Sequence, residues 1–130
     1  MDGHVDVTTL TSAEVGRLGE QLCANFLERR GLEVVERNWV CPAGEADVIA
    51  NDDGTCVLVE VKTRVDLGGH VLPELAVDDA KRSRYERIAR VYLSTHDNVE
   101  NVRFDVAGVT LAPDHVAHLH YISGVWLGDA

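Results

Sequence analysis

Two acids and a lysine near the middle of the chain are the residues whose types and spacing best suit chemistry. Asp47 comes before an Asp-Gly pair, and Glu60 and Lys62 come after it with one valine between them. Paired carboxylates suit Mg²⁺, because proteins commonly hold this ion through one or two carboxylates and leave the rest of its shell to water and phosphate oxygens. The ion polarises a phosphodiester and lowers the pKa of an attacking water. Lys62 would orient that water or stabilise the developing negative charge.

A β-hairpin is the element expected to bring these three side chains together. Asp53-Gly54 accepts the positive φ values of a type I′ turn. With these two residues as the loop, Asp47 lies directly opposite Glu60, whereas a loop over 51–54 makes the two acids diagonal neighbours. Both registers leave Asp47, Glu60 and Lys62 on one face, because side chains along a strand alternate between the faces of the sheet.

The shared face of the hairpin decides between two interpretations. Directly opposed carboxylates repel each other and destabilise a hairpin unless a cation neutralises them. A cross-strand charge ladder on a solvated face is the simpler interpretation of two acids and a lysine. We favour a metal site because the same face also carries Ile49, Cys56 and Leu58, which predict that it is partly buried.

Glu20 is a further acid, at the margin of the apolar stripe of a predicted helix. Gly16, Gly19 and Cys23 make this flank of the helix small, and small residues let a helix come close to a sheet. We therefore expect Glu20 to reach the edge of the sheet near the other acids. A solvated position, which is usual for a glutamate in the middle of a helix, is the alternative.

The charge of the chain is acidic overall but unevenly distributed. The net charge is −10 at pH 7, and an acidic surface repels the phosphates of nucleic acid. Between Lys81 and Arg90, however, five basic residues stand against one acid, Glu86. This segment is either a phosphate-binding surface that includes Lys81, Arg84 and Arg87, or a solvated helix face with salt bridges to neighbouring acids. Lys81 falls within the apolar arc, where it reaches toward a phosphate or snorkels over the core.

The elements expected around these residues are a helix, three strands, a second helix and two further strands. A helix between the third and fourth strands permits parallel pairing there, so we expect an α/β fold with a mixed sheet of about five strands flanked by helices. The length suits one domain, over residues 12–130, after a loose tail over residues 1–11. The expected helices cover 11–30 and 77–94, and the expected strands cover 32–40, 45–50, 55–63, 102–111 and 116–126.

The cysteines and histidines predict no metal centre of their own. Cys23, Cys41 and Cys56 are odd in number and form no C-x-x-C pair, so we expect reduced thiols rather than disulfides or a structural zinc site. His118 and His120 share one face of an expected edge strand, where we favour surface groups over metal ligands. No signal-peptide pattern or bilayer-length apolar run is visible, which predicts a cytoplasmic protein without membrane contact.

Several short motifs resemble those of the YraN-like bacterial family. They occur in the expected order over roughly residues 14–110, and they are Gly16-Arg17-Leu18-Gly19-Glu20, Arg37-Asn38-Trp39, Gly44-Glu45-Ala46-Asp47-Val48-Ile49-Ala50, Val59-Glu60-Val61-Lys62-Thr63-Arg64 and Arg103-Phe104-Asp105-Val106. The family is similar to Holliday-junction resolvases and restriction endonucleases. The resemblance implies a restriction-endonuclease-like core in which Glu20, Asp47, Glu60 and Lys62 converge, with Glu45 in a supporting role and with Arg64 and Lys81 near phosphates.

We therefore expect a Mg²⁺- or Mn²⁺-dependent endonuclease-like protein that hydrolyses phosphodiester bonds in branched or single-stranded DNA. A non-catalytic nucleic-acid-binding or scaffold protein with the same fold, and an interaction domain in which Glu60 and Lys62 form only salt bridges, are the alternatives. A homodimer that pairs two basic helices would offset the acidity of the chain. The expected metal ligands are Asp47, Glu60 and Glu20, the expected catalytic lysine is Lys62, and the expected contacts to nucleic acid are Arg64, Lys81, Arg84 and Arg87.

Overall fold

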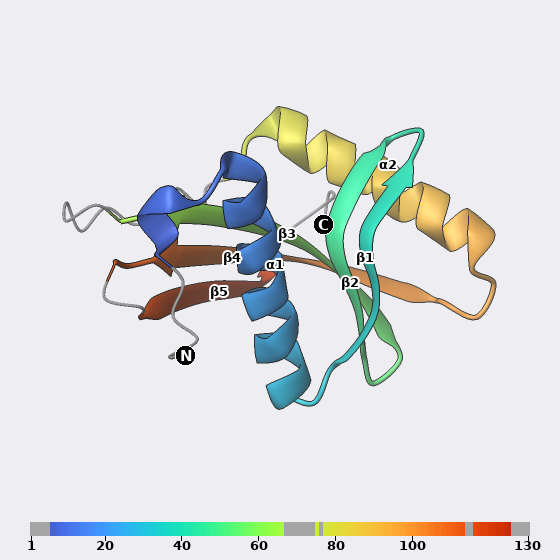
Figure 1. Ribbon diagram of the computed structural model, residues 1–130. Coiled ribbons are helices and arrows are strands. Elements are labelled where there is room, and N and C mark those ends of the chain that lie inside the picture. The colour runs from blue at the N-terminus through green and yellow to red at the C-terminus, as the bar shows by residue number, and fades with distance from the viewer. Residues whose placement is uncertain (1–5, 67–74, 76, 114–115, 126–130) are drawn as a thin grey trace.

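The order of the elements matches the order that the sequence predicts. A computed structural model describes residues 6–66, 75, 77–113 and 116–125 (Figure 1). These residues form an α/β fold in which a five-stranded mixed sheet lies between two helices. The elements are the 3-10 helix η1 (Val7–Thr9), α1 (Ser12–Arg29), β1 (Glu33–Cys41), β2 (Gly44–Asp52), β3 (Thr55–Val65), α2 (Asp79–Thr95), β4 (Asn101–Leu111) and β5 (Ala117–Val125).

The strands lie side by side in the order in which they occur along the chain, from β1 to β5. The β1–β2, β2–β3 and β4–β5 pairs are antiparallel, and the β3–β4 pair is parallel, from Thr55 opposite Asn101 to Val65 opposite Leu111. Parallel strands need a long crossover between them, and α2 lies within that crossover. The predicted parallel pairing is therefore confirmed. Figure 1 shows the β1–β2 hairpin curling away from β4 and β5, toward α2.

Side chains of opposite parity along the central strands build two separate apolar layers. Ile49, Cys56 and Leu58 pack beneath α2 against Tyr85 and Ile88. The intervening residues pack beneath α1 against Cys23 and Leu27, and they are Val48, Ala50, Val57 and Val59. The alternation that the hairpin pattern predicts thus divides the core between the two helices, with Cys56 and Leu58 on the α2 side.

The β2–β3 hairpin has the two-residue loop. Asp53 and Gly54 have φ values of 49° and 96°, as a type I′ turn requires, and Asp52 pairs with Thr55. The ladder continues as far as Val48 opposite Val59 and stops there. In this register the next pair is Asp47 and Glu60, so the two acids face each other just beyond the last ladder pair.

Helix α1 begins at a capping box between Thr11 and Glu14, which confirms its predicted start. Its small flank lies against β3, and its bulkier apolar stripe, with Val15, Leu18 and Leu22, packs toward Val109 and Leu111 of β4. Gly19, Cys23 and Leu27 are buried, whereas most of the stripe is only half-buried. A Cβ atom at Gly19 would come within 1.8 Å of the Thr63 side chain, so only glycine permits this approach to β3.

The loose tail expected over residues 1–11 stays a prediction, because residues 1–5 lie outside the described residues. The described part of this segment contains η1. The Asp6 carboxylate accepts a hydrogen bond from the Thr8 backbone N–H, and Val7 is buried against Val109 and Leu111. In the described part of the chain, neither helix has the length and apolar character needed to cross a membrane.

Candidate functional site

Asp47 lies at the point where β2 and β3 stop pairing. Its Oδ2 atom accepts a hydrogen bond from the Val61 backbone N–H at 2.8 Å. Burial and, to a smaller extent, the nearby charges of Glu20, Glu60 and Glu45 together raise the pKa of Asp47 to about 6, against the effect of the Val61 bond. Carboxylates from α1, β2 and β3 are therefore close enough to influence one another, and this group of four acids is the candidate site.

Glu60 belongs to the same group but is also paired with cations from α2. Lys81 Nζ lies 3.1 Å from Glu60 Oε2, and Arg84 Nη2 lies 3.6 Å from Glu60 Oε1. The Glu60 side chain is 12% exposed. Its buried Oε2 atom nevertheless has no hydrogen-bond partner among the described residues, because the approach of Lys81 is close in distance but poor in direction. Lys81 thus pairs with an acid of the site rather than snorkelling over the core.

Gly44 explains how α2 comes so close to the acids. Its φ of 142° lies in the region that favours glycine, and a Cβ atom there would meet Arg84 Cδ at 3.3 Å and Ile88 Cδ1 at 3.4 Å. The first glycine of the Gly-Glu-Ala-Asp motif therefore lets the β1–β2 hairpin pack on α2. Sequence reasoning did not assign this role, although a glycine within the motif was the available signal.

Glu20 reaches the sheet from α1, as its small flank predicts. Burial raises the pKa of Glu20, and a hydrogen bond with the Asn38 side chain and the charge of Arg37 oppose the shift. Asn38 has a φ of 53°, in the left-handed region, and Arg37 donates to Gln21 Oε1 at 2.8 Å. The Arg37-Asn38 part of a recognised motif therefore holds α1 and its acid, a role that the sequence reasoning left unassigned.

Three other predicted site residues lie outside this group of acids. Lys62 is half-buried and lies two residues beyond Glu60 on β3, so it is on the same face. Arg64 is exposed near the end of β3. Arg87 is exposed on α2, where its Nη1 donates to Ser83 Oγ at 2.8 Å. The structure thus gathers Glu20, Asp47 and Glu60, with Lys62 beside them, and places Arg87 on the outer face of α2.

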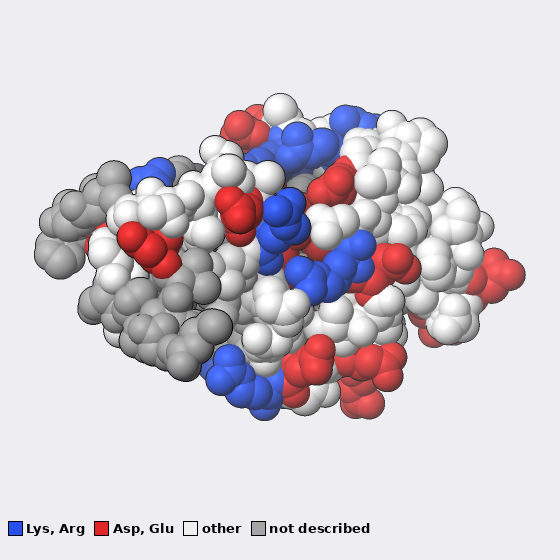
Figure 2. All heavy atoms as spheres, viewed as in Figure 1, with Lys and Arg blue, Asp and Glu red and all other residues white. Residues whose placement is uncertain are grey.

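A hollow of about 390 Å³ lies between the first half of α1 and the end of β3. Glu20, Val61 and Arg64 are in its wall, so the hollow adjoins the group of acids. Figure 2, drawn from the same side as Figure 1, shows basic side chains near the middle of the face, among acidic ones. In Figure 1, α1, α2 and the β1–β2 hairpin approach one another in this region. The remaining residues of the wall are Leu10, Ser12, Val15, Gly16, Thr63 and Val65.

The donor set of the site fits a divalent cation held by two carboxylates. Within the described ranges, no three or more His, Cys, Asp or Glu side chains are arranged to hold a metal ion together. Mg²⁺ needs only one or two protein carboxylates when water and phosphate oxygens complete its shell. The buried Glu60 Oε2 atom without a hydrogen bond and the acids that raise the pKa of Asp47 both fit a cation at this point. His118 and His120 are exposed on β5.

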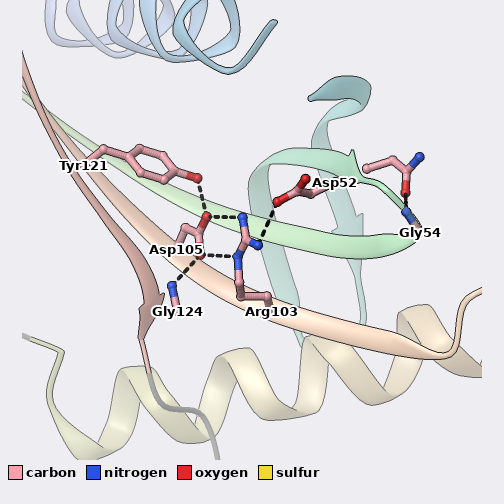
Figure 3. A network of polar contacts seen from close by, with 7 residues as sticks. Asp52, Gly54, Arg103, Asp105, Tyr121 and Gly124 are labelled. Atoms are coloured by element: carbon pink, nitrogen blue, oxygen red, sulfur yellow. Dashed lines mark hydrogen bonds and ion pairs between the residues drawn. The ribbon is translucent and has the colours of Figure 1, made fainter. Parts of the chain in front are cut away.

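The Arg103-Phe104-Asp105-Val106 motif serves a different purpose (Figure 3). Asp105 is completely buried, and Arg103 holds its carboxylate through Nε at 3.0 Å and Nη2 at 3.1 Å. The Tyr121 hydroxyl and the Gly124 backbone N–H also donate to it, while Arg103 Nη1 lies 2.9 Å from Asp52 Oδ2. This network fastens β5 and the end of β2 to β4. The motif therefore supports the fold.

The fold and the site define a class of α/β protein in which carboxylates gather where two central strands part. Residues 19–109 match the family described as Uncharacterised protein family UPF0102. The UPF0102 protein of Beutenbergia cavernae is 44% identical over 113 residues, which cover 85% of this chain and 94% of that protein. The UPF0102 protein of Dictyoglomus thermophilum is 38% identical over 106 residues, covering 79% and 87%. The chain belongs to the UPF0102 family.

Proposed function

We propose that this protein is a metal-dependent endonuclease that hydrolyses phosphodiester bonds in DNA. The observation that carries the proposal is Asp47, whose pKa burial and three neighbouring acids raise to about 6. Grouping partly buried acids costs stability, because each charge is desolvated and repelled by the others. Perturbed groups of this kind are typical of functional sites. The YraN-like motifs, and through them the likeness to junction resolvases and restriction endonucleases, support the same reaction class.

Each residue of the site has a role in this reaction. Asp47 and Glu60 would hold Mg²⁺ or Mn²⁺, and Glu20 would serve as the third acid. When bound, the ion polarises the phosphodiester and lowers the pKa of the attacking water. The Val61 N–H keeps the Asp47 carboxylate in a fixed direction. Lys62, on the face of Glu60, would orient the water or stabilise the charge that develops on the phosphate.

The surroundings of the site favour DNA that presents a short or flexible strand. The net charge of −10 opposes contact with a long duplex. The hollow beside Glu20 offers a local contact, with the exposed Arg64 in its wall to meet a phosphate. Branched or single-stranded DNA is therefore the proposed substrate class. A homodimer that joins two α2 helices would enlarge the basic surface with Arg87.

DNA binding without cleavage is the second candidate function. The observation that favours it is the pairing of Glu60 with Lys81 and Arg84, which neutralises this acid without a metal ion. A protein of this kind would keep the nuclease fold and use its basic side chains on phosphates alone.

The test is incubation of the protein with branched and single-stranded DNA in Mg²⁺ or Mn²⁺. Asp47→Asn removes one charge of the site and leaves an oxygen for the Val61 N–H. Asp53→Asn is the matched control, because it removes the same charge at the exposed turn of the same hairpin. We expect metal-dependent cleavage that Asp47→Asn abolishes and Asp53→Asn retains. Cleavage that persists in Asp47→Asn contradicts the mechanism, and binding without cleavage supports the second candidate.

A further inference from the structure

We propose that Lys81 and Arg84 are phosphate-binding residues that pair with Glu60 in the metal-free protein. A divalent cation that binds Glu60 displaces them and makes them available to a phosphate. The inference rests on the proposed function, since it concerns the same acids and the same ion. It adds a coupling between the two ligands of the site. In the metal-free protein the two cations neutralise Glu60, and in the metal-loaded protein they turn to the DNA phosphate.

The geometry of the two pairs suits an exchange. Glu60 is 12% exposed, whereas the side chains of Lys81 and Arg84 are 22% and 43% exposed, so the cations lie on the solvent side of the acid. The 3.6 Å contact of Arg84 exceeds a hydrogen bond, and the Lys81 contact leaves Glu60 Oε2 without one. Neither of the two contacts has the geometry of a hydrogen bond. A cation that binds Glu60 can therefore displace them at small cost.

The backbone of α2 is anchored, so only the side chains need to move. Tyr85 and Ile88 are buried in the core beneath the helix, and the Tyr85 ring stacks on Phe104 with 4.2 Å between ring centroids. The Asp78 side chain caps the first turn by accepting from the Lys81 backbone N–H. The charged ends of Lys81 and Arg84 therefore stay near the site after they leave Glu60.

The exchange makes binding of the metal ion and of DNA mutually dependent. A divalent ion at Glu60 repels Lys81 and Arg84, and the freed cations offer two positive charges to a phosphate. Because coupling between two ligands is reciprocal, the ion raises the affinity for DNA, and DNA raises the affinity for the ion by the same factor. The coupling gives an acidic chain its strongest hold on DNA in the metal-loaded state.

The first measurement is the affinity for Mn²⁺ alone, by titration calorimetry of the full chain without DNA. Lys81→Gln removes a competitor for Glu60, so we expect roughly five- to tenfold tighter binding of Mn²⁺. Arg90→Gln is the matched control, because Arg90 is exposed on the same helix and loses the same charge. We expect it to change the affinity by less than about twofold, as a screened charge should. Equal effects of the two substitutions overturn the inference.

A double-mutant cycle separates displacement from a general effect of charge. In the Glu60→Gln variant, Lys81 has no Glu60 carboxylate to pair with. Adding Lys81→Gln to that variant should therefore leave its affinity for Mn²⁺ nearly unchanged. The same gain in both backgrounds contradicts the exchange. Thermal unfolding of each variant verifies that it is folded before the titration.

The second measurement is the salt dependence of oligonucleotide binding, by fluorescence anisotropy with Ca²⁺ and with a chelator. Freed cations neutralise phosphates, so Ca²⁺ should make the slope of log affinity against log salt steeper in the unsubstituted protein. The Ca²⁺-dependent steepening should be smaller by about one unit in Lys81→Gln, which has lost one phosphate contact. The same steepening in both proteins overturns the inference.

The outcomes also separate this inference from the proposed function. If Mn²⁺ binds in a manner that Asp47→Asn abolishes, while Lys81→Gln leaves the affinity unchanged, the coupling is wrong and the proposed function stands. If the unsubstituted protein binds no Mn²⁺, the proposed function and the coupling both fail.

Discussion

The surroundings of Asp47 lower the stability of the folded protein when its carboxylate is ionised. Its carboxylate is largely removed from water and lies near three other acids, and it accepts a hydrogen bond from the Val61 N–H. An acid whose folded-state pKa lies above its unfolded value destabilises the fold when it ionises. Natural proteins retain such groups where they serve a function. The residue therefore predicts a cost that can be measured without any knowledge of the substrate.

Asp47→Asn should stabilise the metal-free protein at high pH and have little effect at low pH. The pKa of Asp47 rises from 3.8 to about 6 on folding. The folded state therefore holds the proton more tightly, and the penalty grows as the pH rises from about 4 to about 6 and is complete above that. Removing the charge should raise the unfolding free energy at about pH 8 by on the order of 2 kcal/mol. Chemical denaturation at about pH 8 and about pH 4, in a chelator, measures the difference.

The Asp53→Asn variant is the control for that measurement, because it lies at the exposed turn of the same hairpin. Its unfolding free energy should change little at either pH. A gain in Asp47→Asn that is the same at both pH values would show that ionisation of Asp47 is not the cause.

At the scale of elements, the site depends on how closely α1 approaches β3. The contact is made by the small flank of the helix, with Gly19 directly over Thr63. Leu27 and Cys23 follow on the same buried side, and Glu20 lies next to the contact. The distance between helix and strand therefore sets the position of the helix acid relative to Asp47.

Gly19→Ala should destabilise the protein by about 1–3 kcal/mol, because the added Cβ atom overpacks the contact with Thr63. The helix should move away from β3 and carry Glu20 with it. Gly16→Ala is the matched control, since the space around Gly16 is open. It should be neutral or stabilising by up to about 1 kcal/mol, because alanine is the better helix former.

Urea denaturation of the two alanine variants gives the comparison. A second substitution, Thr63→Ala, removes Oγ1 and Cγ2, two of the three Thr63 atoms that the new Cβ atom would meet, so it should recover part of the loss in Gly19→Ala. No recovery, or an equal cost at Gly16 and Gly19, would contradict the proposed contact.

The whole molecule carries an excess of negative charge that its local pairs offset only in part. Arg103 pairs with Asp52 and Asp105, and Lys81 and Arg84 pair with Glu60. The net charge remains −10. A divalent cation at the site would relieve repulsion at the point where acids from three elements meet, so it should stabilise the folded state as any specific ligand does.

Mg²⁺ or Mn²⁺ should therefore raise the thermal unfolding temperature beyond the effect of NaCl at matched ionic strength. At an ion concentration about 100 times the dissociation constant, binding contributes about 2.7 kcal/mol. The rise should be lost in Asp47→Asn and kept in Asp53→Asn. Scanning calorimetry with and without the ion measures it. An equal rise in both variants would indicate screening of the net charge rather than a site.

Much of the fold was predictable because its signals are local. The capping box at Thr11, the Asp53-Gly54 turn and the alternation along β3 depend on neighbouring residues, and each appears in the structure as predicted. The two-residue loop then aligns Asp47 with Glu60. Burial of Val7 against β4, by contrast, is a contact that no local pattern shows.

The sequence by itself determined the order of the elements and the face that carries Asp47, Glu60 and Lys62, because turn chemistry and side-chain alternation act over a few residues. Only the tertiary structure decided what surrounds that face. The packing of Gly44 on α2 brought Lys81 to Glu60, and the β4–β5 pairing brought Tyr121 and Gly124 to Asp105. These neighbours are distant along the chain, so their identity follows from packing between elements rather than from the pattern within any one of them.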